Sequence, residues 1–177
     1  MAFWNGPNAL TLLRIAAVPV FAWLLAGGSS RWLVLAVFLL AAVTDLVDGW
    51  WARRSGIITD FGKLWDPIAD KALTGAAWLL LSWIGELPWL ATGLILVREV
   101  GITVWRLRVA DRVVLAADRG GKWKTTLQMV TISLWLVGYG YSTASDIALL
   151  GLLWTTVAFT TYTGARYVSA LAGGAEA

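Results

Sequence analysis

Residues 45–70 read DLVDGWWARRSGIITDFGKLWDPIAD and hold five of the eleven acidic residues of the chain. Asp45 and Asp48 are three residues apart at the end of one apolar run, so in a helix they share a face. Asp66 and Asp70 are four apart at the start of the next apolar run and also share a face. Because the connection between the runs is short, we expect antiparallel neighbouring helices that bring these carboxylates together.

Carboxylates gathered in partly apolar surroundings need counter-charges. In one interpretation, the carboxylates are solvated or form ion pairs with nearby basic residues, which are Arg53, Arg54, Lys63 and Lys71. In the other interpretation, the counter-charges are bound cations: oxygen ligands suit magnesium or manganese, and a pair of such ions can stabilise both oxygens of a phosphoryl displacement. The chain has no histidine and no cysteine, so any catalysis must use carboxylates, Lys, Arg and hydroxyl groups.

The composition outside this stretch indicates a membrane protein. Hydrophobic residues make up 59% of the chain and charged residues 14%, whereas a soluble domain is about a quarter charged. A membrane-spanning helix needs about 20 mostly apolar residues. The sequence therefore predicts an all-α integral membrane bundle, forming one domain over residues 1–177. The six predicted transmembrane helices are residues 8–26, 32–51, 67–85, 88–107, 123–141 and 146–168.

Charge and tryptophan placement orient this bundle. Eleven Lys and Arg residues lie on one side of it and only Arg31 lies on the other, which predicts cytoplasmic termini, a multi-pass protein of the cell (inner) membrane and a site facing the cytoplasm. Most of the thirteen tryptophans fall near helix ends, at headgroup level, whereas Trp78, Trp135 and Trp154 are expected to pack between helices. No basic tract indicates nucleic acid as a partner.

Small residues interrupt the bulky ones inside the Asp-rich stretch. Gly49 directly follows Asp48 and allows a ligand to approach the backbone closely, and Arg53 can clamp a phosphate with two hydrogen bonds. Ala52 and Gly62 are small as well. This pattern indicates space for a ligand between the helices.

The same residues resemble the signature of the CDP-alcohol phosphotransferase family, D-x-x-D-G-x-x-A-R, eight residues, then G-x-x-x-D-x-x-x-D. All its fixed positions are present, and these are Asp45, Asp48, Gly49, Ala52, Arg53, Gly62, Asp66 and Asp70. The predicted arrangement of six helices also resembles that of this family. The resemblance implies an enzyme that moves a phosphatidyl group from a CDP-linked lipid to an alcohol and releases CMP.

The resemblance also implies roles for these residues. The four aspartates would hold two magnesium ions, with manganese as an alternative, and Asp70 would be the general base that takes the proton of the acceptor hydroxyl. The positions matching the CDP-lipid site are Gly49, Ala52, Arg53, Thr59 and Gly62. Asn8 and Thr11 either cap the first helix or lie near the nucleotide, and the resemblance leaves both readings open. Relatives also suggest a homodimer.

Three further stretches are similar to family members whose acceptor is glycerol 3-phosphate: residues 7–14, 98–103 and 120–128. That acceptor is a dianion, so the basic residues proposed to bind its phosphate are Arg98, Arg119, Lys122 and Lys124. The alternative for Arg98 is an ion pair with Glu99 or another helix, and for the other three a cytoplasmic flank charge.

Other functions remain open on the sequence. Within the family, the acceptor could be phosphatidylglycerol, as in a cardiolipin synthase, or serine or inositol phosphate. A different class of protein, a small cation transporter, would also carry acids and bases in membrane helices. The charges here cluster at one end of the predicted bundle and do not line a path through it, which favours the enzyme.

Overall fold

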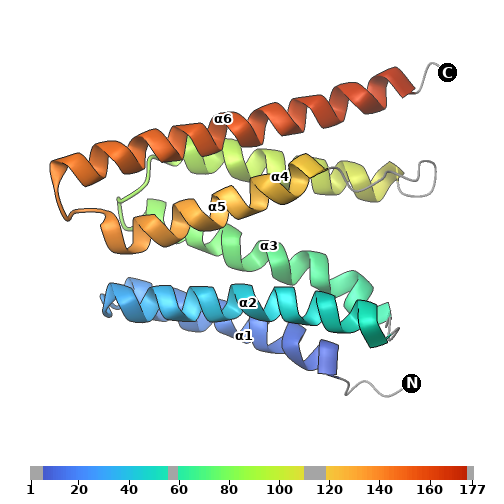
Figure 1. The fold of residues 1–177 in the computed structure, drawn as a ribbon, viewed down its shortest axis with the longest axis horizontal. Helices are drawn as coiled ribbons and strands as arrows, with labels where there is room; N and C mark the ends of the chain where they lie inside the picture. Colours follow the sequence, from blue (N-terminus) through green and yellow to red (C-terminus); the bar gives the residue numbers. More distant parts are fainter. Residues whose placement is uncertain (1–5, 56–59, 110–118, 175–177) are drawn as a thin grey trace. The chain divides into compact units, whose positions relative to one another are not determined.

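The computed structural model describes the backbone of residues 6–55, 60–109 and 119–174, and the side chains of residues 12–44, 71–105 and 123–169. The described residues are entirely helical apart from short connections (Figure 1). The helices are α1 (Gly6–Ala26), α2 (Arg31–Ser55), α3 (Asp60–Trp83), α4 (Trp89–Val109), α5 (Arg119–Gly138) and α6 (Thr143–Gly174). The all-α class and the helix order expected from the sequence are confirmed.

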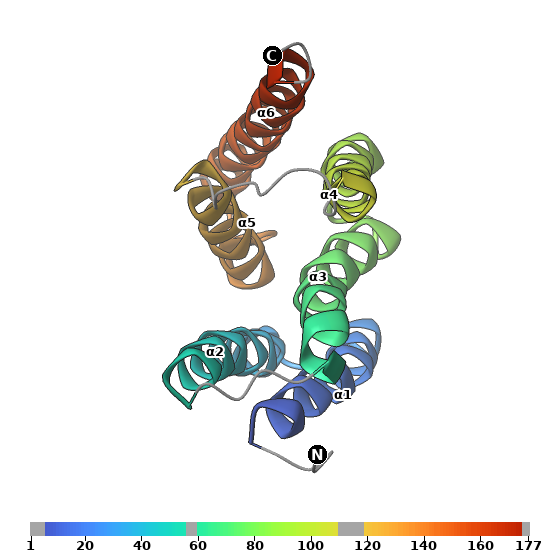
Figure 2. The same ribbon diagram turned by 90° about the vertical axis from the view of Figure 1, so that its right-hand side faces the viewer.

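The chain divides into two compact units, Met1–Ile84 and Gly85–Ala177, and the single domain over residues 1–177 stays a prediction. In the first unit, α1 packs against both α2 and α3, and α2 also contacts α3 (Figure 2). Phe21 of α1 and Phe38 of α2 are fully buried, with ring centroids 5.8 Å apart. Leu73 and Trp78 of α3 are also buried, so apolar contacts hold all three helices together.

In the second unit, α6 packs against both α4 and α5. The buried stripe of α6 includes Leu149, Leu153, Val157 and Thr160, which recur at helical spacing. Facing helices supply further apolar residues, including Ile95, Ile132, Trp135 and Leu136. The interior of this unit is therefore apolar for most of its length, but polar side chains interrupt it near the middle of α4.

The turn signals in the sequence end α1 and α3 as expected, whereas α5 ends at Gly138, three residues before the predicted end at Tyr141. Gly28, Gly85 and Gly140 each follow a helix by two residues and have φ values of 70°, 81° and 78°. A residue with a side chain is strained at such angles, whereas glycine is not. The connection at residues 27–30 and the connection after α3 therefore form where they were predicted.

The start of α6 differs from the prediction because Ser142 and Ser145 cap the helix, whereas the sequence predicts a turn at these residues. Ser145 donates its backbone N–H to Oγ of Ser142 at 3.1 Å, and Ser142 donates its N–H to Oγ of Ser145 at 3.0 Å. This reciprocal pair satisfies two amide groups that a helix start leaves open. The helix consequently begins at Thr143, three residues before the predicted start.

Helices α2 and α3 are longer than predicted, and the polar connection between them is shorter. Helix α2 continues to Ser55, and α3 begins at Asp60, seven residues before the predicted start at Pro67. A proline removes one backbone hydrogen bond, but it does not prevent the residues before it from being helical. Nearly all of the Asp-rich stretch thus lies on helices.

Tryptophan exposure separates the expected core residues from the expected boundary residues. Trp78 and Trp135 are buried, which confirms that they pack between helices. Trp154 is 41% exposed, so the same prediction for it was wrong: it lies off the stripe formed by Leu153 and Val157. The exposed tryptophans near helix ends are Trp23, Trp32, Trp83, Trp89, Trp105 and Trp123. Their headgroup location stays a prediction.

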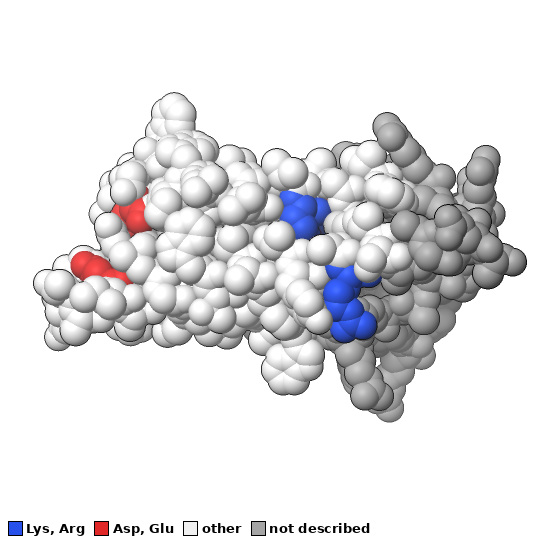
Figure 3. All heavy atoms as spheres, turned by 90° about the horizontal axis from the view of Figure 1, so that it is seen from above, with Lys and Arg blue, Asp and Glu red and all other residues white. Residues whose placement is uncertain are grey.

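Within the described side chains, one helical segment, Thr143–Ser169, is long and apolar enough to cross a membrane. Only 33% of its most apolar window is buried, whereas the central helix of a soluble core would be mostly buried. Two shorter apolar segments are Leu12–Ala26 and Arg31–Thr44. The described surface in Figure 3 is largely uncharged. These features favour association with a membrane, while six membrane crossings and their orientation stay predictions.

Candidate active site

The aspartates of the signature lie on two helices that contact each other. Asp45 and Asp48 are on the last three turns of α2, and Asp66 and Asp70 are on the first three turns of α3. Because both segments are helical, the spacings of three and four residues place the members of each pair on one helix face. The helical placement predicted for both pairs is therefore confirmed, and the convergence of the four carboxylates on one spot stays a prediction.

The donor set of this motif fits a hard divalent cation. Four carboxylates offer oxygen ligands, which magnesium and manganese prefer. Their side chains lie outside those that the structure describes, and the described residues alone contain no group of three or more potential metal ligands. The metal site thus stays a prediction that rests on the donor chemistry and on the two helices.

The positions predicted to bind the CDP-lipid belong to the same unit. Gly49, Ala52 and Arg53 lie on α2 between the two pairs of aspartates, and Gly62 lies in the first turn of α3. Thr59 lies outside the described residues. Asn8 and Thr11 are in the first two turns of α1, where the structure describes the backbone and not their side chains.

Helix α1 also buries a charged residue that is not among the predicted site residues. Arg14 is 1% exposed and lies in the unit that carries the aspartates. A buried guanidinium is costly unless it is partnered. The signal for it was available in the sequence, because Arg14 is the one charge in the apolar run of residues 8–26.

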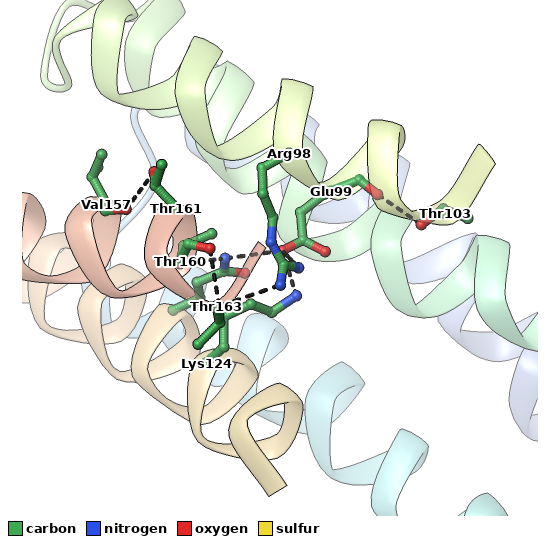
Figure 4. Close-up of polar contacts among 9 residues, drawn as sticks. Arg98, Glu99, Thr103, Lys124, Val157, Thr160, Thr161 and Thr163 are labelled. Atoms are coloured by element: carbon green, nitrogen blue, oxygen red, sulfur yellow. Dashed lines mark hydrogen bonds and ion pairs between the residues drawn. The ribbon is translucent and has the colours of Figure 1, made fainter. Parts of the chain in front are cut away.

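The second unit carries a cluster of polar side chains around Glu99 of α4 (Figure 4). Its Oε1 atom accepts hydrogen bonds from Nη1 of Arg98 at 3.1 Å and from Nε2 of Gln128 at 3.3 Å. Lys124 of α5 forms an ion pair with the same oxygen. The exposed fractions of the Arg98, Glu99 and Lys124 side chains are 14%, 15% and 9%. One carboxylate thus gathers two largely buried cations.

Helix α6 completes this cluster with hydroxyl groups. Gln128 donates from Nε2 to Oγ1 of Thr160 at 3.2 Å, and Arg98 donates from Nη2 to Oγ1 of Thr163 at 3.3 Å. Thr163 in turn donates to the backbone carbonyl of Thr160 at 2.9 Å. We refer to Arg98, Glu99, Lys124, Gln128, Thr160 and Thr163 as the Glu99 cluster. It links three helices that the sequence does not show to be neighbours.

The structure brings together two of the four basic residues predicted to bind the acceptor phosphate, Arg98 and Lys124. It also contains the ion pair between Arg98 and Glu99 that was the alternative for Arg98. For Lys124, burial on α5 differs from an exposed flank charge. Arg119 and Lys122 lie in the first turn of α5, and their side chains are outside those described. The predicted site residues do not include Gln128, Thr160 or Thr163.

The signature, the helical arrangement and a comparison with protein families all indicate the same family. The chain belongs to the CDP-alcohol phosphatidyltransferase family, whose model matches residues 4–162. Among its relatives is a probable phosphatidylglycerophosphate synthase of Mycobacterium tuberculosis, 44% identical over 170 residues that cover 93% of this chain and 80% of the relative. CDP-diacylglycerol–glycerol-3-phosphate 3-phosphatidyltransferases of Rickettsia bellii and Bacillus subtilis are 37% and 35% identical, each match covering 94% of both chains.

Proposed function

We propose that this protein transfers the phosphatidyl group of CDP-diacylglycerol to glycerol 3-phosphate, forming phosphatidylglycerophosphate and CMP. The observation that carries the proposal is the complete signature of eight fixed residues on two contacting helices. The family match over residues 4–162 supports the reaction type, and the names of relatives at 35–44% identity support the acceptor.

In the proposed reaction, a hydroxyl oxygen of glycerol 3-phosphate attacks the phosphorus that carries the lipid. A new phosphorus–oxygen bond forms, and the bond from that phosphorus to the bridging oxygen breaks, so that CMP leaves with the electron pair. Asp70 takes the hydroxyl proton, which is a role that a carboxylate beside the nucleophile can fill. When bound by Asp45, Asp48, Asp66 and Asp70, two magnesium or manganese ions would offset the charge on the pyrophosphate.

The remaining signature residues bind and orient the CDP-lipid in this proposal. Gly49 lets the nucleotide approach the backbone, and Arg53 pairs with a phosphate. Ala52 and Gly62 leave space, while Thr59 contacts the CDP moiety. Asn8 and Thr11 at the start of α1 belong to the same subsite. The protein thereby supplies positioning and electrostatic stabilisation.

The acceptor phosphate is proposed to bind the basic residues of the second unit. Arg98 and Lys124 are suited to this because both are largely buried and already oriented by one carboxylate. A buried cation without a partner is strongly destabilising, so Glu99 would offset part of the positive charge of these two side chains when no acceptor is bound. Arg119 and Lys122, in the first turn of α5, would add further positive charge.

The proposed setting is the inner cell membrane, crossed six times, with both termini and the active site on the cytoplasmic side. The supporting observation is the distribution of Lys and Arg in the sequence, of which only Arg31 lies on the opposite side. The apolar helix segment Thr143–Ser169 is consistent with this setting. Membrane lipids would surround the protein, and a homodimer, which the resemblance to the family suggests, is part of the proposal.

An acceptor panel tests the function. Purified protein is given CDP-diacylglycerol labelled in the phosphatidyl group, magnesium, and one acceptor at a time: glycerol 3-phosphate, serine, inositol phosphate or phosphatidylglycerol. We expect labelled phosphatidylglycerophosphate and an equal amount of CMP with glycerol 3-phosphate. Equal or faster turnover with another acceptor would reject the acceptor assignment, and absence of CMP release with every acceptor would reject the reaction.

A further inference from the structure

Gly164 of α6 lies against the side chain of Arg98 from α4, within the second unit. A Cβ atom built at Gly164 would be 2.9 Å from Cγ and 2.9 Å from Nε of Arg98. Real Cβ atoms essentially never come that close to another heavy atom, so any residue larger than glycine requires Arg98 to move. Gly164 is itself buried.

Arg98 has little freedom to move away from Gly164. The atoms that a Cβ would meet are in the middle of the side chain, and the guanidinium beyond them is held on two sides. Nη1 donates to Glu99 at 3.1 Å, and Nη2 donates to Thr163 at 3.3 Å. A shift at Cγ or Nε would therefore disturb both hydrogen bonds, which depend steeply on geometry.

Among the described glycines of the second unit, only Gly164 would place a Cβ below 3.0 Å from another heavy atom; at Gly138 the nearest atom, Cδ1 of Leu149, would be 3.3 Å away. Gly93, Gly101 and Gly151 are also on helices of this unit, and a Cβ at each of them would meet nothing within 4 Å. Thr163 and Gly164 also lie just beyond residue 162, where the match to the family model ends. The placement of Arg98 thus depends on a part of α6 that lies outside the match to the family model.

We propose that Gly164 is a positioning residue for acceptor binding. Its missing side chain leaves the space through which Arg98 reaches Glu99 and Thr163, and this fixes the guanidinium that receives the acceptor phosphate. The inference rests on the proposed function, because it takes Arg98 as a ligand of glycerol 3-phosphate. Gly164 acts through Arg98 and does not itself contact the substrate.

The test compares Gly164→Ala with Gly151→Ala on the same helix. Both changes add one methyl group and improve helix propensity by about 1 kcal/mol, but only the first meets Arg98. We expect Gly164→Ala to raise the KM for glycerol 3-phosphate by up to about 100-fold, because a misplacement of about 1 Å can cost about that factor. The KM for CDP-diacylglycerol should change less than about twofold, and Gly151→Ala should match the unchanged protein.

Measurements in an Arg98→Ala protein distinguish an effect of Gly164 on the position of Arg98 from an effect on the packing of the helices. In an Arg98→Ala protein the side chain that Gly164 accommodates is gone, so adding Gly164→Ala should raise the KM for glycerol 3-phosphate no further. If Gly164→Ala alone fails to fold, the double variant should recover the thermal stability of Arg98→Ala. Failure to recover would overturn the inference, as would independent effects of the two changes on KM.

The two proposals fail in different ways. If the unchanged protein does not use glycerol 3-phosphate, the proposed function is rejected. If it does use this acceptor while Gly164→Ala and Gly151→Ala give the same KM values, the function stands and the inference about Gly164 is rejected.

Discussion

Lys124 of α5 and Glu99 of α4 form an ion pair that joins two helices of the second unit. The same carboxylate oxygen accepts a hydrogen bond from Arg98, so one negative charge faces two positive charges in a largely buried place. Removing one partner of a buried ion pair leaves an uncompensated charge, and this is more costly than the net contribution of the intact pair. The Glu99 cluster should therefore respond asymmetrically to substitution.

Glu99→Gln should lower stability because it leaves Lys124 and Arg98 without their shared counter-charge. The amide oxygen still accepts hydrogen bonds and the site is 15% exposed, so we expect a loss of about 1–3 kcal/mol, below the 3–5 typical of fully buried pairs. Thermal unfolding of the purified protein measures it. The same substitution at Glu86, in the connection after α3, is the matched control and should have a smaller effect.

The pairing of Glu99 and Lys124 can be isolated by a double-mutant cycle. Lys124→Met alone should destabilise the protein, and the loss in the double variant should be smaller than the sum of the two single losses, since one unpaired charge is removed with its partner. Interaction energies between contacting residues are about 0.5–3 kcal/mol. Strictly additive losses would mean that the ion pair does not contribute to stability.

The sequence predicted the helices well because each apolar run is bounded by residues with strong turn preferences, such as Gly28 and Gly85. It was less accurate at helix starts. Ser142 and Ser145 were read as loop residues, whereas they cap α6 with reciprocal hydrogen bonds. Two serines at this spacing occur both in loops and in helix caps, and only the hydrogen bonds to the backbone distinguish the two.

The site was predictable where function fixes the spacing of residues within the chain. The aspartate pairs needed only helical periodicity, which the structure confirms for α2 and α3. The Glu99 cluster brings together α4, α5 and α6, and Thr163 is 65 residues from its partner Arg98. No local pattern encodes such contacts. The sequence contains one further signal for this cluster, the adjacent charges Arg98 and Glu99 in an apolar run. Because charges inside a membrane helix are costly without partners, this pair indicates contacts with other helices.

Asp70→Asn should abolish phosphatidyl transfer by removing the proposed proton acceptor. An amide cannot take a proton at neutral pH, and loss of a general base reduces rates by about 10²–10⁴. CDP-diacylglycerol binding should be largely retained, because an asparagine side chain still offers an oxygen to the cations and the nucleotide contacts belong to other residues. Rates of CMP release and equilibrium binding of labelled CDP-diacylglycerol measure the two effects.

Asp146→Asn is the matched control for this change, since Asp146 lies at the start of α6 and hydrogen-bonds the backbone of Gly140. It should leave the rate of transfer close to that of the unchanged protein. Unchanged turnover in Asp70→Asn would contradict the role of Asp70 as base.

Removal of divalent cations should stop the reaction. Four aspartates without cations would repel one another, and the pyrophosphate of the substrate would have no counter-charge from the signature apart from Arg53. Exhaustive chelation should therefore eliminate CMP release, and magnesium or manganese in excess should restore it. Full activity after chelation, with the metal content verified as zero, would reject the metal-dependent reaction.

The membrane orientation can be measured cleanly because the chain contains no cysteine. Single cysteines at Ser29, between α1 and α2, and at Ser142, between α5 and α6, should react with an impermeant thiol reagent from the outside of intact cells. Both residues lie in short connections on the side predicted to be external. A cysteine near residue 172 should react only after the membrane is opened. The reverse pattern would invert the topology.

Thr131 of α5 and Thr156 of α6 are fully buried and their Oγ1 atoms are 2.7 Å apart. Each hydroxyl is also within 2.9 Å of a carbonyl of its own helix, Leu127 or Leu152. Two hydroxyl protons cannot make three hydrogen bonds, so one of these three oxygen–oxygen contacts always lacks a proton.

Thr131→Val or Thr156→Val should each lower the free energy of unfolding by about 1 kcal/mol, because a buried hydroxyl then loses its hydrogen-bonding neighbour. Replacing both residues should cost no more than either single change, since the mismatched pair is then removed. Thermal unfolding of the three variants tests this, and a double loss equal to the sum of the single losses would show that both hydroxyls act independently.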